Sequence, residues 1–152
     1  GSIDIEDACL VLKSGYSGKC GLFDLSDGKQ VIDFRYDDIT LLGFNRALGK
    51  DGSRRYLLDT STGDVIASLP PNIGAAHFNE TPVTWIFRAK SYYGIIDEEG
   101  NILYEDAKDP LTGVTKFRHG FSGGQKDNKK WGILKSDGTW LVHPTYDYIK
   151  LL

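Results

Sequence analysis

One pentapeptide in the sequence matches a catalytic pattern. Residues 120–124, Gly-Phe-Ser-Gly-Gly, fit the Gly-x-Ser-x-Gly elbow, in which a tight turn between a strand and a helix exposes a nucleophilic serine. The elbow needs a helix after the serine, but Ser122 is followed by a polar loop, Gln125 to Lys130, and then by a strand-like segment. The only histidine downstream is His143. We therefore interpret Ser122 as a strand residue and expect no hydrolase chemistry.

The other reactive side chains form no motif. The three histidines, His77, His119 and His143, make no i, i+4 pair and have no cysteine beside them, so no metal site is predicted. Adjacent acids occur, as at Asp37-Asp38, but we expect Asp37 and Asp147 to accept backbone N–H groups in bends. No glycine-rich loop opens a helix, as phosphate binding of the P-loop type requires. We predict a protein that is not an enzyme, with no catalytic residue and no cofactor.

Two cysteines and a small basic cluster have structural interpretations. Cys9 and Cys20 flank one predicted turn, so they are either buried free thiols, which we favour, or a bridge across a hairpin. Lys126, Lys129 and Lys130 gather on one loop, which is typical of a solvated turn.

Composition excludes several partners. The chain has 152 residues, with 18 Lys and Arg against 21 Asp and Glu, for a net charge of −3. No basic excess is available to neutralise phosphates, so we expect no nucleic-acid partner. Apolar runs of about four residues, as at Cys9 to Leu12, are too short to span a bilayer. The 18 glycines, many aromatics and only 5 prolines favour short strands joined by tight turns.

Four similar segments divide the chain. Counted from Cys20, Arg55, Tyr93 and Trp131, the steps are 35, 38 and 38 residues. The segments are Cys20-Gly21-Leu22-Phe23-Asp24, Arg55-Tyr56-Leu57-Leu58-Asp59, Tyr93-Gly94-Ile95-Ile96-Asp97 and Trp131-Gly132-Ile133-Leu134, followed by turn glycines Gly28, Gly63, Gly100 and Gly138. Each lies between extended segments and turn residues spaced for strands, and no window has helical periodicity. The fold class is therefore all-β, with four tandem units of antiparallel strands.

Each copy is expected to contain the same strands. The first strands are Ala8 to Lys13, Arg46 to Lys50, Val83 to Lys90 and Phe121 to Lys126. The third strands are Gln30 to Phe34, Asp64 to Ala67, Asn101 to Tyr104 and Thr139 to Val142. A bend and a short fourth strand follow, as at Ile39 to Leu42, Val114 to Phe117 and Ile149 to Leu152. One unit cannot bury its own apolar face, so neighbouring copies must supply the core.

The fourth copy resembles the WG repeat, also called the KWG repeat. Its sequence from Lys130-Trp131-Gly132 to Pro144-Thr145-Tyr146-Asp147 follows that family's pattern closely. The other copies match more loosely, with Cys20 in the Trp place of copy one and Tyr56 in the Gly place of copy two. The resemblance implies a bacterial β-repeat array without assigned catalytic residues. It also implies structural roles for the aromatic and glycine positions: Gly21, Tyr56, Gly94, Trp131, Gly132, Gly28, Gly63, Gly100 and Gly138.

The repeats allow two arrangements. A propeller-like ring, which we favour, would form if Ala8 to Lys13 paired with Tyr148 to Leu152, and an open array would form otherwise. We expect residues 1–2 to be an expression scar and residues 3–152 a single domain with repeats at about 8–43, 44–80, 81–118 and 119–152. No Met occurs, so the natural start is missing, which leaves the compartment open, with the cytoplasm favoured over export.

Binding is the expected function. Irregular loops at Leu69 to Asn72, His77 to Thr84 and Asp106 to Gly113 vary between copies, as binding loops of repeat proteins do. Aromatic residues near them are candidate partner anchors, namely Phe78, Trp85, Tyr92, Phe117 and Phe121. We predict a protein-interaction module, as a part of a larger bacterial protein. The alternatives are an immunity protein that neutralises a toxin and a carbohydrate-binding domain. The partner's identity and the oligomeric state stay open.

Overall fold

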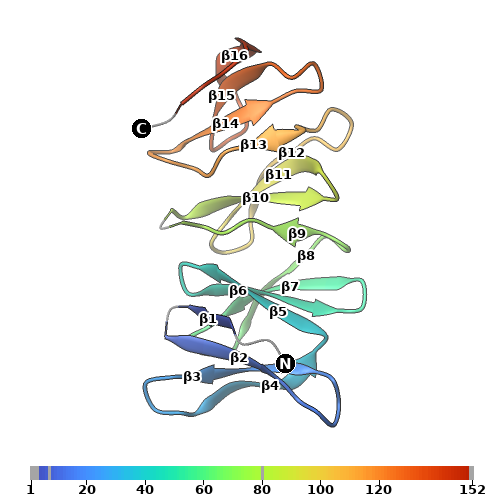
Figure 1. The fold of residues 1–152 in the computed structure, drawn as a ribbon, viewed down its shortest axis with the longest axis vertical. Helices are drawn as coiled ribbons and strands as arrows, with labels where there is room; N and C mark the ends of the chain where they lie inside the picture. Colours follow the sequence, from blue (N-terminus) through green and yellow to red (C-terminus); the bar gives the residue numbers. More distant parts are fainter. Residues whose placement is uncertain (1–3, 7, 80, 151–152) are drawn as a thin grey trace. The chain divides into compact units, whose positions relative to one another are not determined.

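All regular structure in the described chain is β-strand. The computed structural model describes residues 4–6, 8–79 and 81–150. Sixteen strands form four antiparallel sheets of four strands each, and in every sheet the strands follow one another in chain order (Figure 1). The all-β class with four tandem units is confirmed.

The four sheets have the same number of strands but differ in the length of the first strand. The first contains β1 (Asp4–Glu6), β2 (Cys9–Lys13), β3 (Cys20–Asp24) and β4 (Gln30–Tyr36). The second contains β5 (Asp38–Gly43), β6 (Arg46–Asp51), β7 (Arg54–Asp59) and β8 (Val65–Leu69). The third contains β9 (Gly74–Ala75), β10 (Val83–Arg88), β11 (Ser91–Asp97) and β12 (Ile102–Glu105). The fourth contains β13 (Gly113–Val114), β14 (Phe121–Gln125), β15 (Trp131–Lys135) and β16 (Trp140–Tyr146).

The sheets begin one strand earlier than the sequence repeats. Ile39 to Leu42, which ends the first repeat, lies in β5 and opens the second sheet. Val114, from the end of the third repeat, lies in β13 and opens the fourth sheet. Each of these sheets therefore takes its first strand from the preceding repeat, so that strand pairing connects successive copies.

The chain divides into two compact units, Gly1–Ile73 and Gly74–Leu152. In the first unit, one core combines β2 to β4 side chains such as Val11 and Leu22 with side chains from the second sheet such as Leu41 and Leu58. In the second unit, Trp85 and Ile95 of the third sheet share a core with Leu134 of the fourth. In each unit a sheet obtains its apolar partner from the neighbouring repeat.

The ring-closing strand pair is not formed by the described residues. β2 lies between β1 and β3, so both of its edges already have partners. Residues 148–150 belong to no strand, and residues 151–152 lie outside the described chain. The prediction that the segments 8–13 and 148–152 pair was therefore wrong where it can be checked.

The turn glycines after the repeated strand all have left-handed backbones. Their φ angles are 73° at Gly28, 80° at Gly63, 80° at Gly100 and 84° at Gly138. Each N–H closes the turn on a carbonyl of the strand end, as from Gly28 to Asp24 at 2.8 Å. Asp27 and Asp137 have negative φ, so only the glycine of each Asp-Gly pair is left-handed. A residue with a Cβ is strained there, which explains the recurrence of glycine.

The glycine of the Trp-Gly motif faces a bulge in the next strand. Trp131 pairs with Tyr146 and Ile133 pairs with Val142, so three residues of β16 lie opposite Gly132 alone. Copy one has the same arrangement opposite Gly21, between the pairs Cys20–Tyr36 and Leu22–Ile32. A Cβ on Gly132 would lie 2.3 Å from the Val142 carbonyl oxygen. The glycine thus makes room for the bulge, which places Pro144 and Tyr146 inside β16 and not in a bend after it.

Copy two, which lacks this glycine, lacks the bulge. Tyr56 pairs with Ser68 in continuous register with its neighbours. In copy two the glycine lies on the neighbouring strand instead, where Gly49 of β6 pairs with Tyr56 of β7. A Cβ on Gly49 would lie 2.9 Å from both the Tyr36 ring and the Leu58 side chain, so the absence of a side chain at Gly49 leaves room for these two neighbours.

The replacement of Gly132 by alanine tests the bulge. We expect Gly132→Ala to lower the free energy of unfolding by about 1–3 kcal/mol, because the added methyl group meets backbone atoms that cannot rotate away. Gly15→Ala is the matched control, since a Cβ there has no neighbour within 4 Å and φ is not left-handed. Urea unfolding measures both variants. Equal midpoints would contradict the role assigned to Gly132.

Candidate functional site

Ser122 is a structural residue in this fold. It is fully buried in β14, and its hydroxyl donates to the Thr115 carbonyl at 2.7 Å and accepts from Trp85 Nε1 at 2.9 Å. Thr84 holds the equivalent place in β10 and donates to the Ala76 carbonyl at 2.7 Å. Both hydroxyls anchor the segment that precedes their strand, and Ser122 also orients the Trp85 indole.

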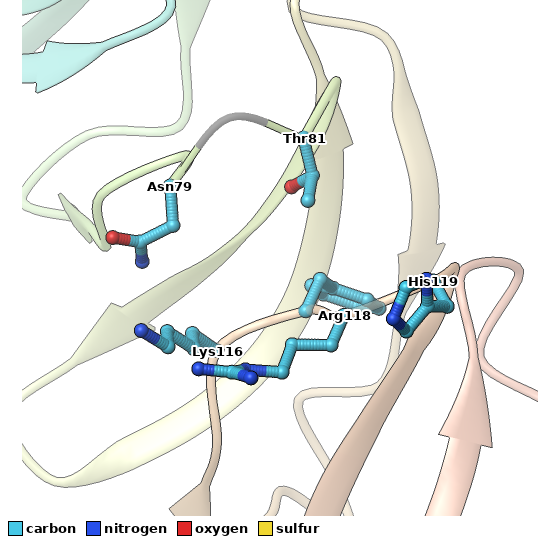
Figure 2. Close-up of a pocket in the computed structure, with 6 residues that line it drawn as sticks. Asn79, Thr81, Lys116, Arg118 and His119 are labelled. Carbon is cyan, nitrogen blue, oxygen red and sulfur yellow. The ribbon is translucent and has the colours of Figure 1, made fainter. Parts of the chain in front are cut away.

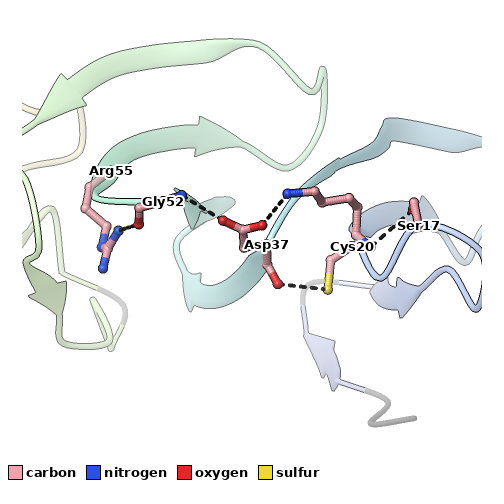
Figure 3. A network of polar contacts seen from close by, with 6 residues as sticks. Ser17, Cys20, Asp37, Gly52 and Arg55 are labelled. Carbon is pink, nitrogen blue, oxygen red and sulfur yellow. Dashed lines mark hydrogen bonds and ion pairs between the residues drawn. The ribbon is translucent and has the colours of Figure 1, made fainter.

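The acid predicted to satisfy a bend links two sheets instead. Within the first unit, Asp37 forms an ion pair with Lys19 and accepts a hydrogen bond from Gly52 N at 2.7 Å (Figure 3). The hydrogen bond from Lys19 and then that from Gly52 lower the pKa of the Asp37 carboxyl. Gly52 lies between β6 and β7, so the carboxylate connects the first sheet to the second. Asp147 is the equivalent residue in copy four and forms an ion pair with Lys130.

Other groups singled out in the sequence also have structural partners. The Lys126 ammonium forms an ion pair with Asp109 at 2.7 Å, so two of the three lysines of the predicted basic loop face carboxylates. Both cysteines are free and buried. Cys9 pairs with Asp24 and Cys20 with Lys13 at opposite ends of the hairpin, which excludes a bridge between them. Burial raises the pKa of the Cys20 thiol.

A polar pocket of about 440 Å³ lies in the second unit. Asn79 and Thr81 come from the loop before β10, and Lys116, Phe117, Arg118 and His119 come from the segment between β13 and β14. Figure 2 shows Asn79 and Thr81 across from the Lys116 and Arg118 side chains, which extend in the same direction. Phe117 is 3% exposed, whereas Lys116 and Arg118 on either side of it are exposed. The alternation gives two cations on one face and an aromatic ring beneath.

Both walls of the pocket are held by local hydrogen bonds. In the first loop, Asn79 N donates to His77 Nδ1 at 2.9 Å and Thr81 Oγ1 donates to the Phe78 carbonyl at 2.7 Å. In the second, Arg118 and Phe121 exchange backbone hydrogen bonds of 2.8 and 2.9 Å around the left-handed pair His119 and Gly120. This is a two-residue hairpin turn with positive φ at both positions. These bonds hold Asn79 and Thr81 on one wall, and the Arg118 backbone on the other, to their own segments of the chain.

The cations of this pocket form no ion pair with a described residue, and Glu80, which lies in the sequence between Asn79 and Thr81, is outside the described chain. Among the described residues, no carboxylate lies within 4 Å of the Lys116 ammonium or the Arg118 guanidinium. A second pocket, of about 280 Å³ in the first unit, is also lined by arginine. There, however, the Arg55 guanidinium donates to the carbonyls of Ile73 at 2.9 Å and Gly52 at 2.8 Å. Arg54, which also lines that pocket, forms no ion pair with a described residue, so cations without such a pair line pockets in both units.

A smaller apolar pocket adjoins the cationic one. It measures about 150 Å³, shares Asn79, Lys116 and Phe117 with its neighbour and is also lined by Ala76, Trp85, Tyr92 and Val114. The Trp85 and Phe117 rings stack with centroids 5.6 Å apart and an interplanar angle of 22°. Three of the five predicted aromatic anchors, Trp85, Tyr92 and Phe117, therefore meet at one pocket. Phe78 is buried at 1% exposure, and Phe121 is partly exposed at the start of β14.

The sequence did not predict Lys116 and Arg118 as binding residues. The loop His77 to Thr84 was identified as irregular, but 114–117 was treated as a strand, and His119 was weighed only as a metal ligand. The signal was present in Lys116-Phe117-Arg118, where two cations flank an aromatic residue at the two-residue spacing of an extended chain. Among the described residues, no group of three or more His, Cys, Asp or Glu side chains is placed to hold a metal ion, and no helix is long and apolar enough to cross a membrane.

The fold is similar to that of several solved β-propeller and β-repeat proteins. The computationally designed Ika8 protein matches with a TM-score of 0.59 and 12% identity over 95% of this chain and 49% of its own. BamB from Moraxella catarrhalis matches at 0.51 with 17% identity over 91% and 40%. Hsv2p from Kluyveromyces lactis matches at 0.53 with 12% identity over 93% and 50%. The chain thus spans half the length of these proteins or less, and the likeness shows the fold alone.

These sheets and their neighbours define the class as an all-β repeat protein. No curated protein matches the chain in sequence. The model of the WG containing repeat matches residues 131–151, which confirms the resemblance to the WG β-repeat family that the fourth copy indicated. The chain is therefore a repeat-based module that carries a WG repeat.

The Trp85–Ser122 hydrogen bond provides a test of the pocket floor. Ser122→Ala leaves a buried indole N–H without its acceptor, and we expect the free energy of unfolding to fall by about 1–3 kcal/mol. In a Trp85→Phe background the same substitution should have a smaller effect, because the indole donor is gone. A double-mutant cycle by chemical denaturation measures the coupling, and additive effects would show that the bond contributes nothing.

The Asp37 contacts predict an acid-dependent contribution to stability. A carboxyl whose pKa is lowered by folding stabilises the folded state above its unfolded pKa, and this contribution disappears as the pH falls through the folded pKa. The difference in unfolding midpoint between wild type and Asp37→Asn should therefore be full at pH 6 and shrink below pH values of about 4. Asp33→Asn removes a carboxylate from the same sheet that accepts no hydrogen bond from a described residue, and its effect should be small at both pH values. A pH-independent difference for Asp37→Asn contradicts the assignment.

Proposed function

We propose that the chain is a non-catalytic protein-binding module whose partner binds at the cationic and apolar pockets of the second unit. The observation that carries the proposal is the pair of exposed cations, Lys116 and Arg118, which form no ion pair with a described residue and lie opposite a loop held by local hydrogen bonds. Backbone segments that are held in place before binding lose less conformational entropy when a partner arrives. The irregular loop 77–84 and the aromatic residues at its base support the same location.

The reactive side chains of the chain support binding over catalysis. Ser122 is buried and hydrogen-bonded, and Asp37 and Asp147 are paired with lysines. The cationic pocket presents Lys116 and Arg118 beside the Phe117 ring. Its charge complements an acidic partner. It therefore offers no support for the immunity alternative in its form with a basic toxin.

Site-specific cross-linking tests the proposal. A photoreactive phenylalanine analogue at Tyr92, which lines the apolar pocket, should capture a protein partner from an extract of the source cells. The same analogue at Tyr16, which is fully exposed in the first unit, should not capture it. Capture should be lost in Lys116→Ala/Arg118→Ala and kept in Lys13→Ala/Lys29→Ala, which removes two exposed lysines from the first unit.

Other outcomes would replace the proposal. Partner capture that survives Lys116→Ala/Arg118→Ala would move the binding site elsewhere. Selective retention on a glycan array with no protein partner would favour the carbohydrate-binding alternative. Hydrolysis of ester or glycoside substrates that is abolished by Ser122→Ala would show that the module is an enzyme.

A further inference from the structure

The two adjoining pockets of the second unit differ in chemistry. The larger presents Lys116, Arg118 and His119, and the smaller presents Ala76, Trp85, Tyr92 and Val114. Asn79, Lys116 and Phe117 line both, so the pockets share a boundary. A ligand that fills both must therefore carry a negative group and an apolar group a short distance apart.

The charged half selects an anion. Two cations without carboxylate partners repel each other, and an anionic group between them removes that repulsion while it forms charge-assisted hydrogen bonds. The guanidinium of Arg118 can hold a carboxylate through two parallel N–H donors. With a net charge of −3, the chain as a whole does not attract polyanions, so the attraction is local to this pocket.

The apolar half has room for an aliphatic side chain but not for a large ring system. Trp85, Tyr92, Phe117, Ala76 and Val114 line it together with the polar residues His77, Thr84 and Thr115 and the shared Asn79 and Lys116. The Trp85 and Phe117 rings stack on each other at 5.6 Å, so they do not present a free pair of faces between which a nucleobase could insert. This arrangement favours a peptide over a single-stranded nucleic acid.

The boundary between the two pockets also offers a group for a peptide backbone. Asn79 Nδ2 donates to the His77 carbonyl at 3.2 Å, which orients the amide. Asn79 Oδ1 accepts no hydrogen bond from any described residue, so it is available to a ligand N–H. In an extended peptide, side chains two positions apart lie on the same face, and backbone N–H groups lie between them.

We infer that the pockets bind an extended peptide segment of a protein partner in which an Asp or Glu and an aliphatic residue are two positions apart and therefore lie on the same face. The carboxylate lies between Lys116 and Arg118, the aliphatic side chain enters the apolar pocket against Trp85 and Phe117, and Asn79 accepts a backbone N–H. This inference rests on the proposed function and names the ligand of that same site.

Selection from a displayed library of random octapeptides tests the ligand chemistry on the full chain. Peptides that bind wild type should be enriched in Asp or Glu two positions away from Leu, Ile or Val. Synthetic versions of the selected peptides should lose at least about tenfold in affinity for Lys116→Ala/Arg118→Ala and little for Lys13→Ala/Lys29→Ala. The salt dependence of the affinity should fall in the pocket variant alone, because the ionic contacts are gone.

A pocket-filling variant tests the apolar half separately. Ala76→Leu places a larger side chain at the wall of the 150 Å³ pocket. It should weaken the selected peptide about tenfold and leave unchanged a control peptide with Gly in place of the aliphatic residue. Unfolding midpoints equal to wild type show that each variant is folded.

Each contrary result has one meaning. Selected peptides without acidic residues, affinity that survives Lys116→Ala/Arg118→Ala, or equal losses for both peptides in Ala76→Leu would overturn the inference. Tighter binding of a dodecathymidylate, or of phosphoserine peptides with no binding of Asp or Glu peptides, would also overturn it. If cross-linking at Tyr92 still captures a pocket-dependent partner, the proposed function stands although its ligand was wrongly assigned. If it does not, both fail.

Discussion

In two of the four sheets, the pairing of the last two strands depends on a glycine, because a side chain at its position would collide with the next strand. Opposite Gly132, and again opposite Gly21, the next strand accommodates three residues where a regular ladder has one. A Cβ would lie 2.3 Å from a carbonyl oxygen in one case and 2.7 Å in the other, so only glycine fits without backbone movement. The bulge brings the tyrosine back into register with the residue before the glycine. The following aspartate then faces the lysine two positions before the glycine. The Lys, Gly, Tyr and Asp of the motif are thus one geometric unit.

The two remaining copies show how the fold tolerates loss of that unit. Copy two has Tyr56 in the glycine place. Around Tyr56 the pairing with β8 continues without a shift, and Gly49 of β6 faces Tyr56 from the other side. Copy three keeps Gly94 but pairs it directly with Glu105, and the position of the motif lysine is Tyr92. Tyr92, which stands where the motif has lysine, lines the apolar pocket. Divergence of a repeat from its consensus thus supplies a side chain to the candidate site.

The sequence predicted the parts of the fold that depend on local chemistry. Turn glycines need positive φ and strands need alternating or continuous apolar residues, and both signals lie within a few residues of each other. Which strand begins each sheet was not predictable in this way. β9 and β13 have only two residues each, and they belong to their sheets because of pairing with β10 and β14, not because of their own composition. The bulge was mistaken for a bend because His143-Pro144-Thr145 carries a turn signal that is satisfied within the strand.

Only the aromatic half of the candidate site was predicted from the sequence, for a related reason. Large aromatic residues near a loop are visible in a sequence, and Trp85, Tyr92 and Phe117 were found in that way. Whether a cation is available to a ligand depends on what faces it in three dimensions. Lys126 and Lys130 looked like a basic cluster, but folding brings Asp109 and Asp147 to them. Lys116 was placed within a strand and Arg118 just after it, but β13 ends at Val114, and the segment that follows brings both residues to the pocket across from Asn79 (Figure 2). Charge in a sequence becomes a binding property only after folding has decided which cations face carboxylates.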